Sequence, residues 1–189
     1  MTKVFVSCDS SSRSMGSDEL ALRIRQEGLR LGHDVQIVRT GSRGLTWLEP
    51  YIEVETPAGR VGYGNVELRD LAHLINIGML DGRPVGNTIG LVDEYPWLAK
   101  QDRVTFRRLG VVDPSSLADY ERNGGLVALR KALLSTRQQI VDSVKESGLR
   151  GRGGAGFPAG IKWQTVLDHP GDQKYICCNA DEGDSGTFA

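Results

Sequence analysis

The sequence predicts an α/β protein that consists of a small amino-terminal domain and the first part of a second α/β domain. Strand-like and helix-like segments alternate within residues 1–80, and glycine and proline interrupt this pattern over residues 81–112. Helical periodicity then leads into a glycine-rich loop within residues 113–189. We therefore expect two domains joined by a connector at residues 81–112.

The first domain is predicted to have the order β-α-β-β-α. Its strand-like segments are rich in β-branched and aromatic residues and comprise residues 3–8, 34–39 and 51–56. Residues 18–31 carry leucine and isoleucine on one helical face, and Gly32 is placed to end that helix. A second helix is predicted over residues 66–77.

The second domain is predicted to begin with helices. Pro114 is suited to the first position of a helical turn over residues 114–120, and Asp113 is its expected amino-terminal cap. Residues 126–144 carry apolar side chains on a helical repeat and predict one continuous helix.

Composition excludes several classes of protein. Hydrophobic residues make up 39% of the 189 and charged residues 25%, which is typical of a soluble globular protein. The 23 basic and 24 acidic side chains provide no broad positive field for nucleic acid. We find no signal peptide and no apolar run of the ~18 residues that a membrane span requires. These features predict a cytoplasmic protein.

Three cysteines are too few for a disulfide framework or a four-thiolate metal site. Cys177 and Cys178 are adjacent, and their Cα atoms are too close for an unstrained disulfide. We expect all three, Cys8 included, to be buried or half-buried free thiols. The three histidines lack ligand spacing, so no metal site is predicted within the chain.

Glycine is concentrated near the carboxyl end, with six of the 24 glycines between Gly148 and Gly160. A backbone without Cβ atoms allows a flat or phosphorylated ligand to approach the main chain closely. Pro158 is placed to begin a helix that continues to Leu167, and the amino end of that helix would favour an anion.

Two familiar nucleotide-binding motifs do not fit this loop. Gly151, Gly153 and Gly156 satisfy G-x-G-x-x-G, but a Rossmann site requires a preceding strand and here a helix precedes the loop. The phosphate loop of NTPases is excluded because no hydroxyl residue follows Lys162. The loop therefore represents another type of glycine-rich site, with Arg150, Arg152 and Lys162 beside it.

Residues 174–178 read as a buried strand that ends at a group of polar side chains. Polar groups at the carboxyl end of a strand are a common ligand site in open α/β sheets. A solvated acidic turn is the alternative interpretation. The polar residues of this group are Asn179, Asp181, Glu182 and Asp184.

Two stretches carry a resemblance to a known family. GLRGRGGAGFPAGIKW at residues 148–163 and CNADEGDSGTF at residues 178–188 closely resemble the flavin-binding subunit of NADH:quinone oxidoreductase. This family includes the diaphorase subunits of NAD-reducing hydrogenases and of NAD-dependent formate dehydrogenases. The resemblance extends upstream to about residue 102.

The first 80 residues resemble the thioredoxin-like [2Fe-2S] ferredoxin module that some of these diaphorases carry at the amino terminus. TGSRGLTWLEP at residues 40–50 is similar to the stretch in which that module places two cluster cysteines, and Ser42 and Thr46 occupy those positions here. We therefore expect the thioredoxin-like domain to lack cluster ligands. The Trp-Leu-Glu-Pro run, the fused domain and Asp184-Ser185 are most similar to the formate dehydrogenase branch.

The resemblance implies an NAD-dependent flavoprotein oxidoreductase subunit, the diaphorase (beta) subunit of a formate dehydrogenase. Such a subunit exchanges hydride between NAD(H) and FMN and passes electrons to or from iron–sulfur clusters. Because the flavin does the chemistry, no catalytic side chain is expected. Lys162 would meet the phosphate or ribityl oxygens of FMN, and Phe157 would stack on the nicotinamide nucleotide or else be a core aromatic. The implied cofactor-binding residues are Gly151, Arg152, Gly153, Gly154, Phe157, Lys162, Asn179, Asp181 and Glu182.

Family proteins are longer, so we expect the chain to be an amino-terminal piece with the ligands of a [4Fe-4S] cluster outside it. The implied partners are NAD(H), a [2Fe-2S] thioredoxin-like subunit and a catalytic iron–sulfur subunit. Alternative functions are the diaphorase of an NAD-reducing hydrogenase or of a respiratory NADH dehydrogenase. For residues 1–80, the favoured alternative is a docking module without chemistry of its own.

Overall fold

A computed structural model describes residues 1–152 and 155–178 of the chain. The chain forms two compact units, Met1–Leu126 and Val127–Ala189, which we describe separately. No helix in the described ranges is long and apolar enough to cross a membrane.

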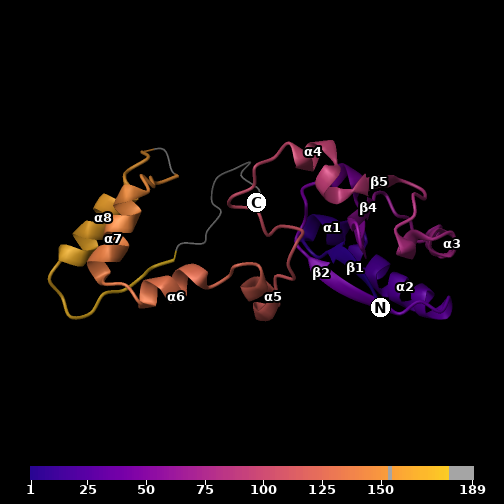
Figure 1. The fold of residues 1–189 in the computed structure, drawn as a ribbon, viewed down its shortest axis with the longest axis horizontal. Helices are drawn as coiled ribbons and strands as arrows, with labels where there is room; N and C mark the ends of the chain where they lie inside the picture. The colour runs from indigo at the N-terminus through magenta and orange to yellow at the C-terminus, as the bar shows by residue number, and fades with distance from the viewer. Residues whose placement is uncertain (153–154, 179–189) are drawn as a thin grey trace. The chain divides into compact units, whose positions relative to one another are not determined.

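The first unit is built on a five-stranded mixed sheet with the order β2-β1-β3-β4-β5 (Figure 1). β1 and β2 are parallel in the register Thr2↔Val35 to Ser7↔Thr40, and each remaining neighbour pair is antiparallel. The strands are β1 (Thr2–Ser7), β2 (Val35–Thr40), β3 (Ile52–Thr56), β4 (Gly59–Tyr63) and β5 (Thr88–Leu91).

Helix α2 (Ser17–Arg30) packs one side against this sheet and forms the main core with it. Leu20 and Ile24 of α2 are fully buried with Val4, Val6 and Val54 of the sheet. The helix ends as the sequence predicts, because Gly32 adopts φ +83° and the His33 N–H returns to the Gly28 carbonyl at 2.8 Å. Shorter elements of this unit are α1 (Ser10–Ser14), α3 (Leu71–Asn76), α4 (Pro96–Ala99), α5 (Leu117–Arg122), η1 (Thr46–Leu48), η2 (Met79–Asp81) and η3 (Val92–Glu94).

The predicted α/β fold class is confirmed, and the β-α-β unit followed by β3, β4 and α3 is thioredoxin-like. The three predicted strands and the long helix are present within one or two residues of their expected bounds. The predicted helix over residues 66–77 is shorter and begins at Leu71. Residues 81–112, expected as a connector, contribute β5 to the sheet.

The second face of the sheet carries a buried charged cluster. The Glu53 carboxylate accepts hydrogen bonds from Arg43 Nε at 2.8 Å and from Arg60 Nη1 at 3.1 Å, and its side chain is only 4% exposed. Arg60 also donates to the carbonyls of Gly110 and Val111 at 2.7 and 3.0 Å. Its guanidinium lies 3.4 Å from the centre of the Phe5 ring. These contacts hold the end of the expected connector against the sheet.

Asp113 does not cap a helix, which corrects the sequence prediction. Its carboxylate accepts from the Ser115 N–H at 2.8 Å and closes a turn. Helix α5 starts later, at Leu117, and Ser116 is its cap because the Ser116 hydroxyl accepts from the Asp119 N–H.

The second unit contains three helices within its described residues: α6 (Val127–Leu133), α7 (Arg137–Glu146) and α8 (Ala159–Asp168). The single helix predicted over residues 126–144 is therefore wrong. Thr136 and Gln139 form a reciprocal capping box that begins a new helix. In Figure 1, α7 and α8 lie side by side as a helical pair.

The strand predicted over residues 174–178 is also wrong for this structure. These residues have no regular secondary structure, and Tyr175 and Ile176 are almost fully exposed. A strand requires a neighbour for its backbone hydrogen bonds, and the described residues of the second unit contain no other strand. Cys177 and Cys178 are consequently exposed, whereas Cys8 is half-buried as expected.

Candidate functional site

The glycine-rich segment between α7 and α8 folds as a tight hairpin closed by backbone hydrogen bonds. The Gly151 N–H donates to the Phe157 carbonyl at 2.8 Å, and the Ala159 N–H donates to the Leu149 carbonyl at 2.8 Å. Arg150 pairs with Pro158 as an antiparallel bridge, and Arg150 Nε donates to the Gly156 carbonyl at 2.7 Å. Arg150 therefore stabilises the hairpin itself.

Two glycines of the hairpin are required by backbone conformation. Gly148 ends α7 with φ +65°, and Gly156 has φ +54°, a region in which side chains are strained. Gly151 differs, because a Cβ there would lie an ordinary 3.6 Å from the Phe157 carbonyl oxygen. Gly148 and Gly156 are thus needed for the turn geometry, whereas Gly151 leaves space beside the backbone.

Helix α8 begins directly at the base of the hairpin. Pro158 is its N-cap residue, and among the described residues no side chain caps the N–H groups of the first turn. Lys162 follows within the first helical turn and is exposed. The site therefore combines helix N–H groups and a cation, both of which favour an anionic ligand.

Helix α8 is held against α7 by a close crossing and by a polar network. A Cβ on Gly160 would lie 2.8 Å from Lys145 Cα, so only glycine fits at this crossing. Beside it, Gln164 Oε1 accepts from Lys145 Nζ at 2.6 Å and from Gln138 Nε2 at 2.9 Å. These contacts fix the amino end of α8 next to the hairpin.

The predicted cofactor residues within the described ranges are Gly151, Arg152, Phe157 and Lys162. Gly151, Arg152 and Phe157 lie on the hairpin and Lys162 on the adjoining turn of α8, and the Phe157 side chain is 50% exposed. The structure therefore brings these four residues into one short region. Gly153, Gly154, Asn179, Asp181 and Glu182 lie outside the described residues.

Sequence reasoning missed Gly160 and Gln164 as the residues that position α8. The concentration of glycine places Gly160 with the loop, although its place inside a predicted helix is a signal of close packing. Gln164 had no recognisable signal, because its role depends on contacts with Gln138 and Lys145 from another helix.

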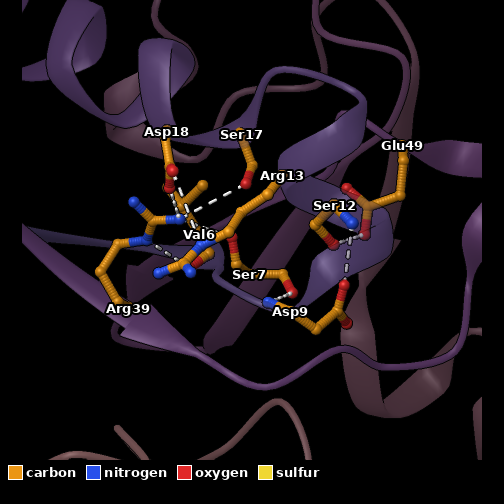
Figure 2. Close-up of polar contacts among 9 residues, drawn as sticks. All are labelled: Val6, Ser7, Asp9, Ser12, Arg13, Ser17, Asp18, Arg39 and Glu49. Carbon is orange, nitrogen blue, oxygen red and sulfur yellow. Dashed lines mark hydrogen bonds and ion pairs between the residues drawn. The ribbon is translucent and has the colours of Figure 1, made fainter. Parts of the chain in front are cut away.

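A second polar site lies in the first unit, where the parallel strands β1 and β2 end (Figure 2). Asp9 caps α1, and its carboxylate accepts from the Ser12 N–H at 2.8 Å. Glu49, in the segment after β2, is 95% buried and accepts from the Ser12 hydroxyl at 2.6 Å and the Tyr51 N–H at 2.9 Å. Ser12 and Glu49 thus join the two segments that follow β1 and β2.

The balance between burial and hydrogen bonds shifts the pKa values of the two carboxyl groups of this site in opposite directions. Burial raises the pKa of Glu49 above its ordinary value, and the negative charge of Asp9 adds to this, although hydrogen bonds from Ser12 and Tyr51 act in the other direction. Burial would also raise the pKa of Asp9, but hydrogen bonds from Ser12 and Ser11 outweigh it and leave that pKa below its ordinary value.

Arg39 occupies the neighbouring part of the same region (Figure 2). Its guanidinium donates to the Ser7 carbonyl at 2.9 Å and to the Asp18 carboxylate at 2.6 Å. Arg13 lies 3.5 Å from the same carboxylate. These contacts tie β2 to the end of β1 and the start of α2.

Ser42 and Thr46, the two positions that the sequence resemblance compares with cluster cysteines, carry hydroxyl side chains in this region. The Ser42 hydroxyl accepts from the Gly44 N–H at 2.9 Å, and Thr46 begins the η1 turn with an exposed side chain. Among the described residues, no group of three or more histidine, cysteine or carboxylate side chains is arranged to hold a metal ion.

Comparison with known proteins matches the carboxyl-terminal part of the chain to one family. Residues 144–189 match the model of the Nuo51 FMN-binding domain. The chain is 55% identical over 85 residues to the HndC subunit of the NADP-reducing hydrogenase of Solidesulfovibrio fructosivorans, an alignment that covers 45% of this chain and 17% of the relative. It is 57% identical over 86 residues to the F 2 subunit of the NADH-quinone oxidoreductase of Rhizobium meliloti. That alignment covers 45% of this chain and 20% of the relative.

A third relative is the alpha subunit of the NAD-reducing hydrogenase HoxS of Cupriavidus necator, 50% identical over 60 residues that cover 32% of this chain and 10% of the relative. Among solved structures, a thioredoxin-like [2Fe-2S] ferredoxin from Aquifex aeolicus is similar with a TM-score of 0.41 and 21% identity, covering 51% of this chain and 96% of that one. The chain spans a fifth or less of the length of these three curated relatives. Residues 144–189, which include the hairpin and α8, thus match a Nuo51 FMN-binding domain, and the homologues are subunits of NADH-quinone oxidoreductases and of hydrogenases.

Proposed function

We propose that the chain is part of a flavoprotein oxidoreductase subunit and that the hairpin with the amino end of α8 forms one wall of its FMN and NAD(H) site. The observation that carries this proposal is the coincidence of two results. The family match covers residues 144–189, and the same region holds the glycine hairpin, the uncapped amino end of α8 and Lys162.

The described residues fit an FMN molecule by their chemistry. An anionic phosphate suits the uncapped first turn of α8, and the exposed cations Arg152 and Lys162 add positive charge beside it. Gly151 leaves the backbone open to a flat ring, and half-exposed Phe157 offers an aromatic face for stacking. Asn179, Asp181 and Glu182 are proposed to hold the ribityl chain and the ring edge.

The flavin, when bound, supplies hydride exchange with the nicotinamide and single-electron transfer to iron–sulfur clusters. The residues of this chain would bind the flavin and hold it in place. The hairpin and α8 bind and orient the cofactor, and the α7–α8 contacts at Gly160 and Gln164 keep that wall in place. A [4Fe-4S] cluster with ligands outside this chain would accept or supply the electrons.

We further propose an NAD-dependent formate dehydrogenase complex as the setting of this subunit. The fused amino-terminal domain, the Trp-Leu-Glu-Pro run at residues 47–50 and Asp184-Ser185 support this choice. An NAD-reducing hydrogenase or a respiratory NADH dehydrogenase is the alternative, because the matched relatives are of those kinds. The complex purified from its own cells should reduce NAD with formate, and reduction with hydrogen alone would favour the alternative.

For the first unit we propose a docking role without electron transfer. Its sheet and core are well formed, and the sequence resemblance assigns Ser42 and Thr46 to positions of cluster cysteines, which hydroxyl side chains do not replace as ligands. Partners would be a [2Fe-2S] thioredoxin-like subunit and a catalytic iron–sulfur subunit. Removal of this unit should release such a partner from the purified complex while the flavin content of the remaining subunit stays unchanged.

A further inference from the structure

The edge strand β2 directs unpaired backbone groups outward. The Thr2 N–H donates to the Asp34 carbonyl at 2.7 Å, and the Cys8 N–H donates to the Thr40 carbonyl at 2.8 Å. In the parallel register with β1, even-numbered residues of β2 therefore pair with β1. Odd-numbered Val35, Ile37 and Arg39 direct their N–H and C=O groups to the other side, where the sheet has no further strand.

This edge lacks the devices that proteins use to protect exposed strands. The sequence of β2 contains no proline and no lysine, and the strand pairs over all six of its residues without a bulge. The one charged side chain of β2, Arg39, turns back to Asp18 and the Ser7 carbonyl and leaves the edge open (Figure 2). Within residues 1–152 and 155–178, no hydrogen bond is made to the outward N–H and C=O groups of Val35, Ile37 and Arg39.

Helix α2 adds an exposed apolar row beside the same edge. Asp18 contacts Arg39, which identifies the side of α2 that faces β2. Leu22, Arg25 and Leu29 follow Asp18 at helical spacing on that side, and Arg25 lines a shallow groove together with Val35 and Ile37. Leu22 is 55% and Leu29 76% exposed.

We propose that β2 pairs antiparallel with β2 of a second copy of this chain, so that two five-stranded sheets become continuous. A two-fold axis at Ile37 places Ile37 opposite Ile37 of the second copy and Val35 opposite Arg39 of the second copy. This register uses every outward residue of β2, and each directly opposed pair exchanges two hydrogen bonds.

A second copy is the occupant that this edge fits best, because β2 complements itself. The register sets no like charges directly opposite one another along the strands, and it closes as a dimer without leaving this edge free. It also brings the two α2 helices alongside each other, where Leu22 and Leu29 are covered. Arg25 is long and exposed, so its guanidinium turns to solvent.

Amide exchange of the purified chain, followed by NMR at rising protein concentration, tests the register. Exchange of the Val35, Ile37 and Arg39 amides should slow as the dimer forms. The Gln36 and Val38 amides are already bonded to β1 and should not change. Unchanged exchange at all three odd-numbered positions, or a monomer at every concentration in sedimentation velocity, would overturn the proposal.

Variants of the strand and of α2 test the contacts. Ile37→Pro removes an outward N–H and no bond to β1, so the dimer is lost; because the Ile37 side chain packs against the main core, Ile37→Ala, which keeps the N–H, measures the packing cost and should retain the dimer. Leu22→Glu changes an exposed side chain and should raise the dimer dissociation constant about tenfold or more. Leu68→Glu, a substitution of an exposed leucine beyond this edge, is the matched control and should leave the dimer intact. A dimer that survives both edge variants unchanged would exclude β2 as the interface.

Discussion

Gly160 lies against the backbone of Lys145, so that a Cβ atom built on Gly160 would be 2.8 Å from both Lys145 Cα and Lys145 N. Real Cβ atoms do not approach backbone this closely, and the two helices must separate to admit one. The position of α8, and with it the amino end that faces the hairpin, therefore depends on a hydrogen atom at position 160.

Gly160→Ala is expected to destabilise the second unit by roughly 1–3 kcal/mol, the range for overpacking a well-fitted contact. The free energy of unfolding from denaturant titration measures this effect. Gly171→Ala is the matched control, because a Cβ there meets nothing closer than 3.9 Å. Equal stability of the Gly160 variant and the parent would show that α7 and α8 do not pack as described.

Lys162→Ala should weaken FMN binding by more than the ~1 kcal/mol of an exposed ion pair, while the stability of the cofactor-free protein stays level or rises slightly. A cation in the first turn of a helix is mildly unfavourable until an anion neutralises it. Titration of FMN into the deflavinated protein gives the affinity, and Lys131→Ala on α6 provides a lysine control. An unchanged FMN affinity would contradict the assignment of Lys162.

Valine in place of Gly153 should abolish flavin retention, because a β-branched side chain would fill the space that the glycine-rich loop leaves for a ligand. Gly153 lies outside the described residues, so this expectation rests on the sequence resemblance. Flavin content after gel filtration, compared with that of the parent protein, is the measurement. Equal content in both would remove Gly153 from the site.

Glu49→Gln should remove part of the pH dependence of stability. The raised pKa of Glu49 means that the folded state binds the proton more tightly, so its contribution is present below the ordinary pKa of ~4.3 and is lost as the pH rises through the raised value. Glutamine can still accept from the Tyr51 N–H and donate to the Ser12 hydroxyl. The variant should therefore gain stability relative to the parent as the pH increases.

Thermal unfolding over a pH series separates this effect from that of Asp9, whose lowered pKa contributes stability that is lost as the pH falls. Asp9→Asn is the companion variant: it should remove the loss of stability on the acid side and, because the Asp9 charge also raises the Glu49 pKa, move the Glu49-dependent part of the profile to lower pH. Parallel curves for Glu49→Gln and the parent would show that folding does not raise the pKa of Glu49.

Glu53→Gln should destabilise the first unit by about 3–5 kcal/mol, because two largely buried guanidinium groups would lose their common carboxylate. Glu55→Gln on the same strand is the control: Glu55 forms an exposed pair with Lys3, so a change below ~1 kcal/mol is expected. Amide exchange near Gly110 and Val111 should accelerate only in the Glu53 variant. A loss no greater than that of the control would show that the buried charged cluster at Glu53 does not hold residues 110–111 against the sheet.

The first unit should not assemble a [2Fe-2S] cluster when iron and sulfide are supplied anaerobically. A cluster requires four thiolates, or two histidines in place of two of them, and this unit contains only Cys8. The chain carrying serine at Cys177 and Cys178 excludes binding by those exposed thiols. Stoichiometric iron with an electron paramagnetic resonance signal after reduction would overturn the docking role.

The sequence predicted the long, strongly patterned elements of the first unit and missed those that depend on distant partners. β1, β2 and α2 carry clear periodicity, whereas β4 contains two glycines and is stabilised by pairing with β3 and β5. The break between α6 and α7 had a local signal in Thr136 and Gln139 that apolar periodicity concealed.

Prediction of the candidate site had a similar limit. The helix from Pro158 follows from local chemistry and is present. The exposed segment at residues 174–178 shows the opposite case, because an apolar run becomes a strand only beside another strand. The contacts of Gln164 could not be predicted, since they require the relative placement of two helices.

Whether the hairpin and α8 form a flavin-binding wall is decided by the flavin content and NADH reactivity of the protein purified from its own cells. We expect a visible flavin spectrum, FMN as the extracted cofactor, and bleaching of that spectrum on addition of NADH, with FMN lost in the Gly153→Val variant and bound more weakly in the Lys162→Ala variant. A protein that contains no FMN, or whose FMN is retained in full by both variants, would contradict this assignment.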